Sequence, residues 1–155
     1  MTPAKAIDPA QVCAEIHCRT PDPADVRVVA AGGGVKLVRG EKELTPPFVA
    51  IDSFDVSAER KEVVFSAKRK DNFDVGLVSI DGSDIHWIFE DPADETLVQW
   101  APKGNKISYV MHSVTGDLVR TVHIPTAATL TVPFRWSRVR ALAWEPAAVR
   151  CFRRL

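Results

Sequence analysis

Short apolar runs separated by turn residues fill the chain from Val26 onward. The runs cover residues 26–30, 35–38, 43–45, 63–65, 75–78, 85–88, 107–110 and 118–122. Glycine turns lie between several of them, among them Asp81-Gly82, Lys103-Gly104 and Thr115-Gly116. Many short strands joined by tight turns are typical of an antiparallel all-β fold. No long stretch of helical periodicity follows residue 25, which argues against crossover helices and a parallel sheet.

Residues 1–25 carry a different pattern. Asp8 followed by Pro9 is a favourable helix start, with an N-cap residue and a proline at the first helical position. The pattern predicts a short helix over residues 10–18, which Pro21 and Pro23 end. We therefore expect residues 1–25 to form a short N-terminal helical arm or linker.

The cysteines of this chain do not indicate a disulfide framework or a metal site. Cys13, Cys18 and Cys151 are odd in number, so at most one bridge can form within the chain. Cys13 and His17 are four residues apart and Glu15 lies between them, but no second ligand pair follows at zinc-type spacing. A plain helix with an apolar face is the favoured interpretation, and whether Cys13 pairs with Cys18 is open.

An internal repeat is the strongest signal in the sequence. Shifted by 44 residues, the chain matches itself without gaps over several key positions. The matched sets are Phe54 with Val98 and Leu142, Val56 with Trp100 and Trp144, Ala58 with Pro102 and Pro146, Val63 with Ile107, and Phe65 with Tyr109; a shift of 43 matches Asp74 with Asp117. A period near 44 that holds about four short strands is the spacing of a β-propeller blade.

Two segments of the repeat resemble the TolB-like (WD40-like) propeller family. Residues 100–110 read WAPKGNKISYV, and residues 65–83 contain NFDV and then DGS. The family pattern is W-S-P-D-G-K-x-I-A-F, then D-I-Y, then D-G-S. The resemblance covers about residues 26–146. It implies a partial β-propeller of about three four-stranded antiparallel blades, at about 26–48, 49–92 and 93–136, with the start of a further blade at 137–155.

The repeated residues have structural reasons for their types. A large tryptophan ring can fill the wedge between adjacent blades, a proline and a glycine shape the following turn, and an aspartate can accept backbone N–H groups where a strand starts. We interpret as structural blade residues Phe54, Phe65, Asp74, Trp100, Pro102, Gly104, Tyr109, Asp117 and Trp144.

Three blades do not close a propeller, which usually has four to eight. Residues 26–155 hold about three periods of 44 residues. An open row of blades exposes an apolar blade face that has to be covered. Three explanations stay open: missing blades in a longer protein, several copies that close a ring as a homo-oligomer, or a partner chain that supplies blades.

Composition and charge exclude some functions and leave the location open. Lys+Arg number 20 and Asp+Glu 20, so the chain lacks the basic footprint of a nucleic-acid binder. No apolar stretch approaches the roughly 20 residues of a membrane span. The N-terminus shows no apolar signal core, which together with the odd number of cysteines favours the cytoplasm. The family resemblance instead implies the bacterial envelope or periplasm.

The sequence contains no recognisable catalytic motif. The patterns G-x-S-x-G, H-E-x-x-H, the P-loop and G-x-G-x-x-G are all missing from it. We therefore expect no enzyme activity, no cofactor and no metal. His112 and His123 flank a predicted hairpin and could approach each other, but two imidazoles without a carboxylate are a weak metal signal.

Two charged segments could bind a partner. Glu90, Asp91, Asp94 and Glu95 cluster in the linker between two predicted blades, and the family resemblance implies that such linkers lie near the central channel. These four residues form the candidate partner-binding loop, for a basic peptide or a cation, with a solvated loop as the alternative. Residues 135–155 are in contrast rich in arginine, which could steer association between copies or simply keep edge strands soluble.

The sequence favours a non-enzymatic scaffold that binds protein or peptide through its blade-connecting loops. Two alternatives stay open at this stage. The chain could be an accessory gating propeller of a serine peptidase or other hydrolase whose catalytic domain lies elsewhere, or a truncated propeller fragment without its own activity. The fold cannot decide among them, because propellers host unrelated functions.

Overall fold

The computed structural model describes residues 25–89 and 91–144, and within them it contains strands and turns without a helix. The first sheet holds β1 (Val26–Ala31), β2 (Gly34–Arg39) and β3 (Lys42–Glu43). The second holds β4 (Ala50–Ser57), β5 (Glu62–Lys68), β6 (Phe73–Ser79) and β7 (His86–Trp87). The third holds β8 (Asp94–Trp100), β9 (Lys106–Ser113), β10 (Gly116–His123) and β11 (Ala128–Trp136). We call them the first, second and third blades.

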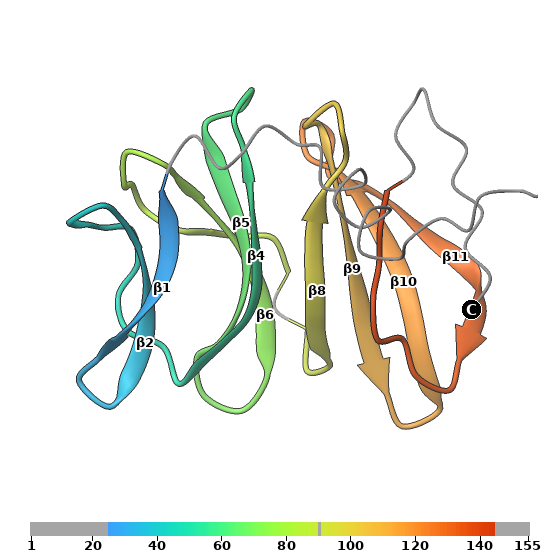
Figure 1. Ribbon diagram of the computed structural model, residues 1–155. Helices are drawn as coiled ribbons and strands as arrows, with labels where there is room; N and C mark the ends of the chain where they lie inside the picture. The colour runs from blue at the N-terminus through green and yellow to red at the C-terminus, as the bar shows by residue number, and fades with distance from the viewer. Residues whose placement is uncertain (1–24, 90, 145–155) are drawn as a thin grey trace, which may run out of the picture.

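Each blade is a simple antiparallel meander. Strands pair with their neighbours in chain order, so that β4 and β8 lie at one edge of their sheets and β7 and β11 at the other. Figure 1 shows the three sheets standing side by side in the order of the chain. The predicted all-β class and the partial propeller are confirmed. The first blade, however, has three strands among the described residues where four were expected.

Two apolar layers hold the row together, one on each face of the second blade. Alternation along β5 produces them, because Val63 and Phe65 point toward the first blade while Val64 points toward the third. The layer between the first and second blades contains Val26, Leu37, Leu44, Phe48, Val63, Phe65, Ala67 and Val78. The layer between the second and third contains Val64, Val75, Leu77, Val98, Trp100, Ile107, Tyr109 and Val122.

Gly76 leaves room for an aromatic cluster in the first of these layers. Phe48, Phe65 and Trp87 contact one another with ring centroids 5.5–5.8 Å apart. A Cβ at Gly76 would lie 2.7 Å from Cζ of Phe65 and 3.1 Å from two ring carbons of Trp87. The sheet therefore needs glycine at this position for steric reasons.

We expect Gly76→Ala to lower the free energy of unfolding by about 1–3 kcal/mol, the usual cost of overfilling a packed core. Chemical denaturation followed by tryptophan fluorescence measures it. Lys70→Ala, at an exposed position of the β5–β6 turn, is the control and should leave stability within about 0.5 kcal/mol. Equal stability of the glycine variant and the control would contradict the tight contact.

Candidate functional site

The junction between the second and third blades is formed by side chains of β4 that bind the backbone of β8. Asp52 accepts a hydrogen bond from the N–H of Leu97 at 2.9 Å, and Asp55 accepts one from the N–H of Trp100 at 2.7 Å. The hydroxyl of Ser53 accepts the N–H of Val98 at 3.1 Å. These hydrogen bonds fix the position of β8, and of the linker that leads into it, relative to the second blade.

A β-bulge in β8 makes this arrangement possible. Consecutive N–H groups of a regular strand point to opposite edges, yet those of Leu97 and Val98 both bind β4. The register of β8 against β9 shifts between Thr96 and Gln99, and Leu97 has a φ of 54°. The bulge turns two neighbouring amides toward the same partner strand.

The described part of the candidate partner-binding loop is held in place by the β5–β6 turn. The side-chain amide of Asn72 donates to the carbonyl of Asp91 at 2.6 Å and to Asp74 at 2.9 Å. Asp94 accepts the N–H of Phe73 at 2.9 Å, and Asp91 accepts the N–H of Ala93 at 3.0 Å. Asp94 is exposed and Asp91 is half-buried. Glu90 lies outside the described residues.

Glu95 departs from the sequence-based expectation because it is buried in the junction. Its side chain is 0% exposed, and neither carboxylate oxygen has a hydrogen-bond partner among the described residues. It cannot contact a partner that docks on the loop surface. It lies opposite Met111 on β9, on the face that meets the second blade.

The pKa of the Glu95 carboxyl is raised to about 7, chiefly by burial, and the negative charges of Asp74 and Asp91 contribute to the rise. The backbone of Val75 and the guanidinium of Arg120 act in the opposite direction. Tyr109 lies on the same face, and its burial, with the nearby Glu95, raises the pKa of its phenol to about 12. Tyr109 is therefore protonated at neutral pH, and Glu95 is mostly protonated below about pH 7.

A hydrogen-bond network on the other face of the third blade escaped the sequence analysis. Nδ1 of His112 lies 2.7 Å from Asp117, and its Nε2 lies 2.6 Å from the hydroxyl of Thr96. The second oxygen of Asp117 accepts the N–H of Val139 at 2.7 Å. His112, on β9, lies opposite Asp117 near the start of β10, whereas His123 ends β10. The expected approach of the two histidines is therefore wrong.

The order hydroxyl, imidazole, carboxylate is that of a nucleophilic triad, but the surroundings favour a structural role. Thr96 is only 8% exposed. The N–H of the next residue, Leu97, which would stabilise an oxyanion in such a site, donates to Asp52. The network instead ties four segments together: β8, β9, β10 and the chain at Val139.

The residues interpreted as structural blade residues differ in their burial. Trp100, Tyr109 and Phe65 are at most 1% exposed, within the two apolar layers. Asp74 and Asp117 are buried and hydrogen-bonded where β6 and β10 begin. Phe54 is partly buried beside the first layer, Pro102 is exposed, Gly104 has a φ of 66° and donates to Ala101 at 2.8 Å, and Trp144 is half-buried.

The described residues contain no group of three or more His, Cys, Asp and Glu side chains placed to hold a metal ion. Over the same ranges, no helix is long and apolar enough to cross a membrane. The segment of Cys13, Glu15, His17 and Cys18 lies outside the described residues, as does the predicted arm as far as residue 24.

Comparison with known proteins yields a likeness of fold. No protein-family model matches the chain, and no curated protein matches it. A solved structure assigned as TolB from Agrobacterium tumefaciens is similar with a TM-score of 0.53 and 16% sequence identity. The similarity covers 63% of this chain and 40% of that one. At this identity the likeness shows a TolB-like propeller fold alone.

Proposed function

We propose that this chain is a non-enzymatic binding scaffold whose linker between the second and third blades contacts a basic peptide segment of a protein partner. The observation that carries the proposal is the fixed position of Asp91 and Asp94. Both carboxylates are held by backbone N–H groups, and Asn72 holds the linker from the neighbouring turn. Because these charged side chains are already ordered before binding, a partner loses less free energy in ordering them.

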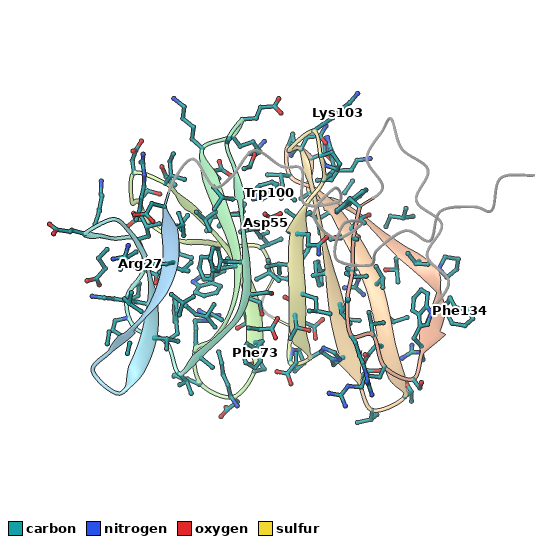
Figure 2. All side chains as sticks on the ribbon, viewed as in Figure 1. Arg27, Asp55, Phe73, Trp100, Lys103 and Phe134 are labelled. Carbon is teal, nitrogen blue, oxygen red and sulfur yellow. The ribbon has the colours of Figure 1, made fainter. Side chains whose placement is uncertain are left out.

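The location of the linker suits a partner that spans two blades. Figure 2 shows Phe73, whose N–H binds Asp94, toward the lower end of the strands and Lys103 at their upper end. The turn 69–72 of the second blade and the start of β8 meet at the Phe73 end. A peptide lying there would meet residues of both blades, and propeller loops commonly serve as recognition surfaces.

A fluorescent lysine-rich peptide tests this proposal by anisotropy titration at low and at physiological salt. We expect saturable binding that weakens with salt and that Asp91→Asn with Asp94→Asn weakens about threefold to tenfold, since exposed ion pairs contribute up to about 1 kcal/mol each. Asp84→Asn, which removes an exposed carboxylate from another loop, is the matched control. Binding that ignores the double variant, or a glutamate-rich peptide that binds equally well, would refute the proposal.

Self-association belongs to the same proposal. Two large apolar side chains are exposed on β11, the outer edge strand of the third blade: Leu130 is 68% exposed and Phe134 is 58% exposed. A second copy or further blades would cover such side chains, in keeping with the homo-oligomer expected from the sequence. The gating propeller of a hydrolase and the inactive fragment stay predictions without a structural observation that favours them.

A further inference from the structure

The segment 138–144 follows β11 and is held against the third blade by two hydrogen bonds. Asp117, at the start of β10, accepts the N–H of Val139 at 2.7 Å, and the side-chain amide of Gln99 on β8 donates to the carbonyl of Leu142. Figure 1 shows this segment, in red, turning back after β11 and running along the third blade. Its residues belong to none of the three sheets.

The second blade holds β8 through the corresponding positions of the repeat. The hydroxyl of Ser66 donates to the carbonyl of Glu95, and the hydroxyl of Ser53 accepts the N–H of Val98. Glu95 and Val98 precede the two bound residues of segment 138–144 by 44 positions, which is the period of the repeat. Each blade therefore binds the chain that follows it at the same two points.

The inner strands make a third contact of this kind. Asp55 on β4 accepts the N–H of Trp100 on β8 at 2.7 Å. Gln99 on β8 lies 44 positions after Asp55, and it binds the backbone of segment 138–144 in turn. The segment thus occupies the place that the inner strand of a fourth blade would have.

The side chains of segment 138–144 are less covered than their counterparts on β8. Val139, Leu142 and Trp144 are half-buried, whereas the residues 44 positions earlier are at most 2% exposed. β8 pairs with β9 along its length, but within the described part of the chain no strand pairs with the segment. A second strand beside the segment would cover the apolar surface that is still exposed.

The charge of segment 138–144 indicates what kind of strand fits beside it. Arg138 and Arg140 are exposed, and neither takes part in an ion pair with another described residue. The residues 44 positions earlier on β8 lie opposite His112 and Val110 of β9. Acidic residues at the positions of these two would face the arginines, and opposite charges on directly opposed residues stabilise a strand pair.

We propose that segment 138–144 binds an extended strand of a partner protein, on the side where β8 pairs with β9. The strand that fits carries apolar residues at alternate positions, as β9 does over residues 107–111, and carboxylates at the positions of Val110 and His112. In such strand addition, backbone hydrogen bonds supply affinity and the alternate side chains supply specificity. The site is separate from the linker that precedes β8, and the proposal does not rest on the function assigned to that linker.

The pairing of the other strands favours a partner protein over a second copy of this chain. The strands of the complete blades that carry the fitting alternation of apolar residues are β5 and β9. β5 pairs with β4 and β6, and β9 pairs with β8 and β10. A folded second copy therefore offers neither of these two strands for binding.

A fluorescent strand peptide tests the site by anisotropy titration of the full-length chain. Its sequence is that of residues 106–113 with Val110→Glu and His112→Glu. We expect saturable binding, at least about fivefold tighter than that of the same peptide with lysine at both positions, because opposed like charges destabilise a strand pair. A scrambled peptide of the same composition should bind at least about fivefold more weakly than the glutamate peptide, because it lacks the alternation.

A charge exchange on the chain shows whether the peptide binds at this segment. Arg138→Glu with Arg140→Glu should reverse the preference, so that the lysine peptide binds more tightly than the glutamate peptide. Lys70→Glu with Lys103→Glu changes two exposed positions in other turns and is the matched control, which should keep the original preference. Circular dichroism verifies that both variants are folded. A preference that survives the arginine exchange, or a scrambled peptide that binds equally well, would overturn the proposal.

Light scattering on a sizing column distinguishes a second copy from a partner strand. A dimer that binds no strand peptide and that Arg138→Glu with Arg140→Glu dissociates would mean that a second copy covers the segment, which overturns the proposal. A monomer that binds no strand peptide would overturn it as well. Asp91→Asn with Asp94→Asn should leave binding of the strand peptide unchanged, so that the segment and the linker before β8 are tested separately.

Discussion

Replacing Trp100 by alanine should lower the free energy of unfolding by about 3–5 kcal/mol, the cost of emptying the space of a buried aromatic residue. Trp100 is 1% exposed at the end of β8 and contacts both the second and the third blade within their shared apolar layer. The guanidinium of Arg60 also lies over its ring, 5.5 Å from the centroid. Because domains are stable by only about 5–15 kcal/mol, this loss is a large fraction of the total stability.

Urea denaturation followed by circular dichroism measures this loss. Trp136→Ala is the control, because Trp136 is half-buried on the outermost strand β11 and contacts chiefly Phe134, at a centroid distance of 4.7 Å. We expect the control to cost less than half as much. Equal losses of stability in the two variants would mean that Trp100 contributes no more to the packing between the blades than Trp136 contributes at the outer edge.

The repeat made the second strand of each complete blade predictable, whereas the inner strands were harder to identify. Val63 and Phe65 recur as Ile107 and Tyr109 with clear alternation, and both pairs are buried as their pattern indicates. β4 contains polar residues such as Asp52, whose role is to bind the next blade rather than to face water or core. That role depends on a contact between blades, which a local pattern does not contain. β11 was missed although Leu130, Val132, Phe134 and Trp136 alternate along it.

The burial of Glu95 could not be predicted because a bulge follows it. In a regular strand Glu95 would lie on the face opposite to Trp100, since the two residues are an odd number of positions apart. The shift between Thr96 and Gln99 instead places Glu95, opposite Met111, on the same face as Trp100, opposite Ile107. Leu97 adopts a positive φ without being a glycine or an asparagine, so the residue types gave no sign of the bulge.

The hydrogen-bond network around His112 also could not be predicted from local sequence patterns. Its members, Thr96, His112 and Asp117, come from three strands, and no spacing rule relates them. A signal existed in the match of Asp74 with Asp117, since both lie at the start of the third strand of their blade. Asp74 accepts the side-chain amide of Asn72 there, and Asp117 accepts the N–H of Val139. The repeat thus located the carboxylate but not its histidine partner.

Glu95→Gln should remove a loss of stability that the unsubstituted protein suffers as the pH rises. The folded carboxyl has a pKa of about 7 against 4.5 for an unperturbed glutamate. Between these values the unfolded chain releases a proton that the folded chain keeps, so stability is full below about pH 4.5 and declines up to about pH 7. At about 1.4 kcal/mol per pH unit, the total decline reaches about 3 kcal/mol, and it levels off above pH 7.

Thermal unfolding between pH 4.5 and 8.5 measures the difference between the two proteins. Relative to the unsubstituted chain, Glu95→Gln should gain melting temperature as the pH rises, by several degrees overall, because about 1 kcal/mol corresponds to about 2–4 °C in a domain of this size. Asp94→Asn, one residue earlier and exposed, is the matched control and should follow the unsubstituted protein. A constant difference between the Glu95→Gln variant and the unsubstituted chain would mean that Glu95 ionises at an ordinary pH and that water or a cation reaches the junction between the blades.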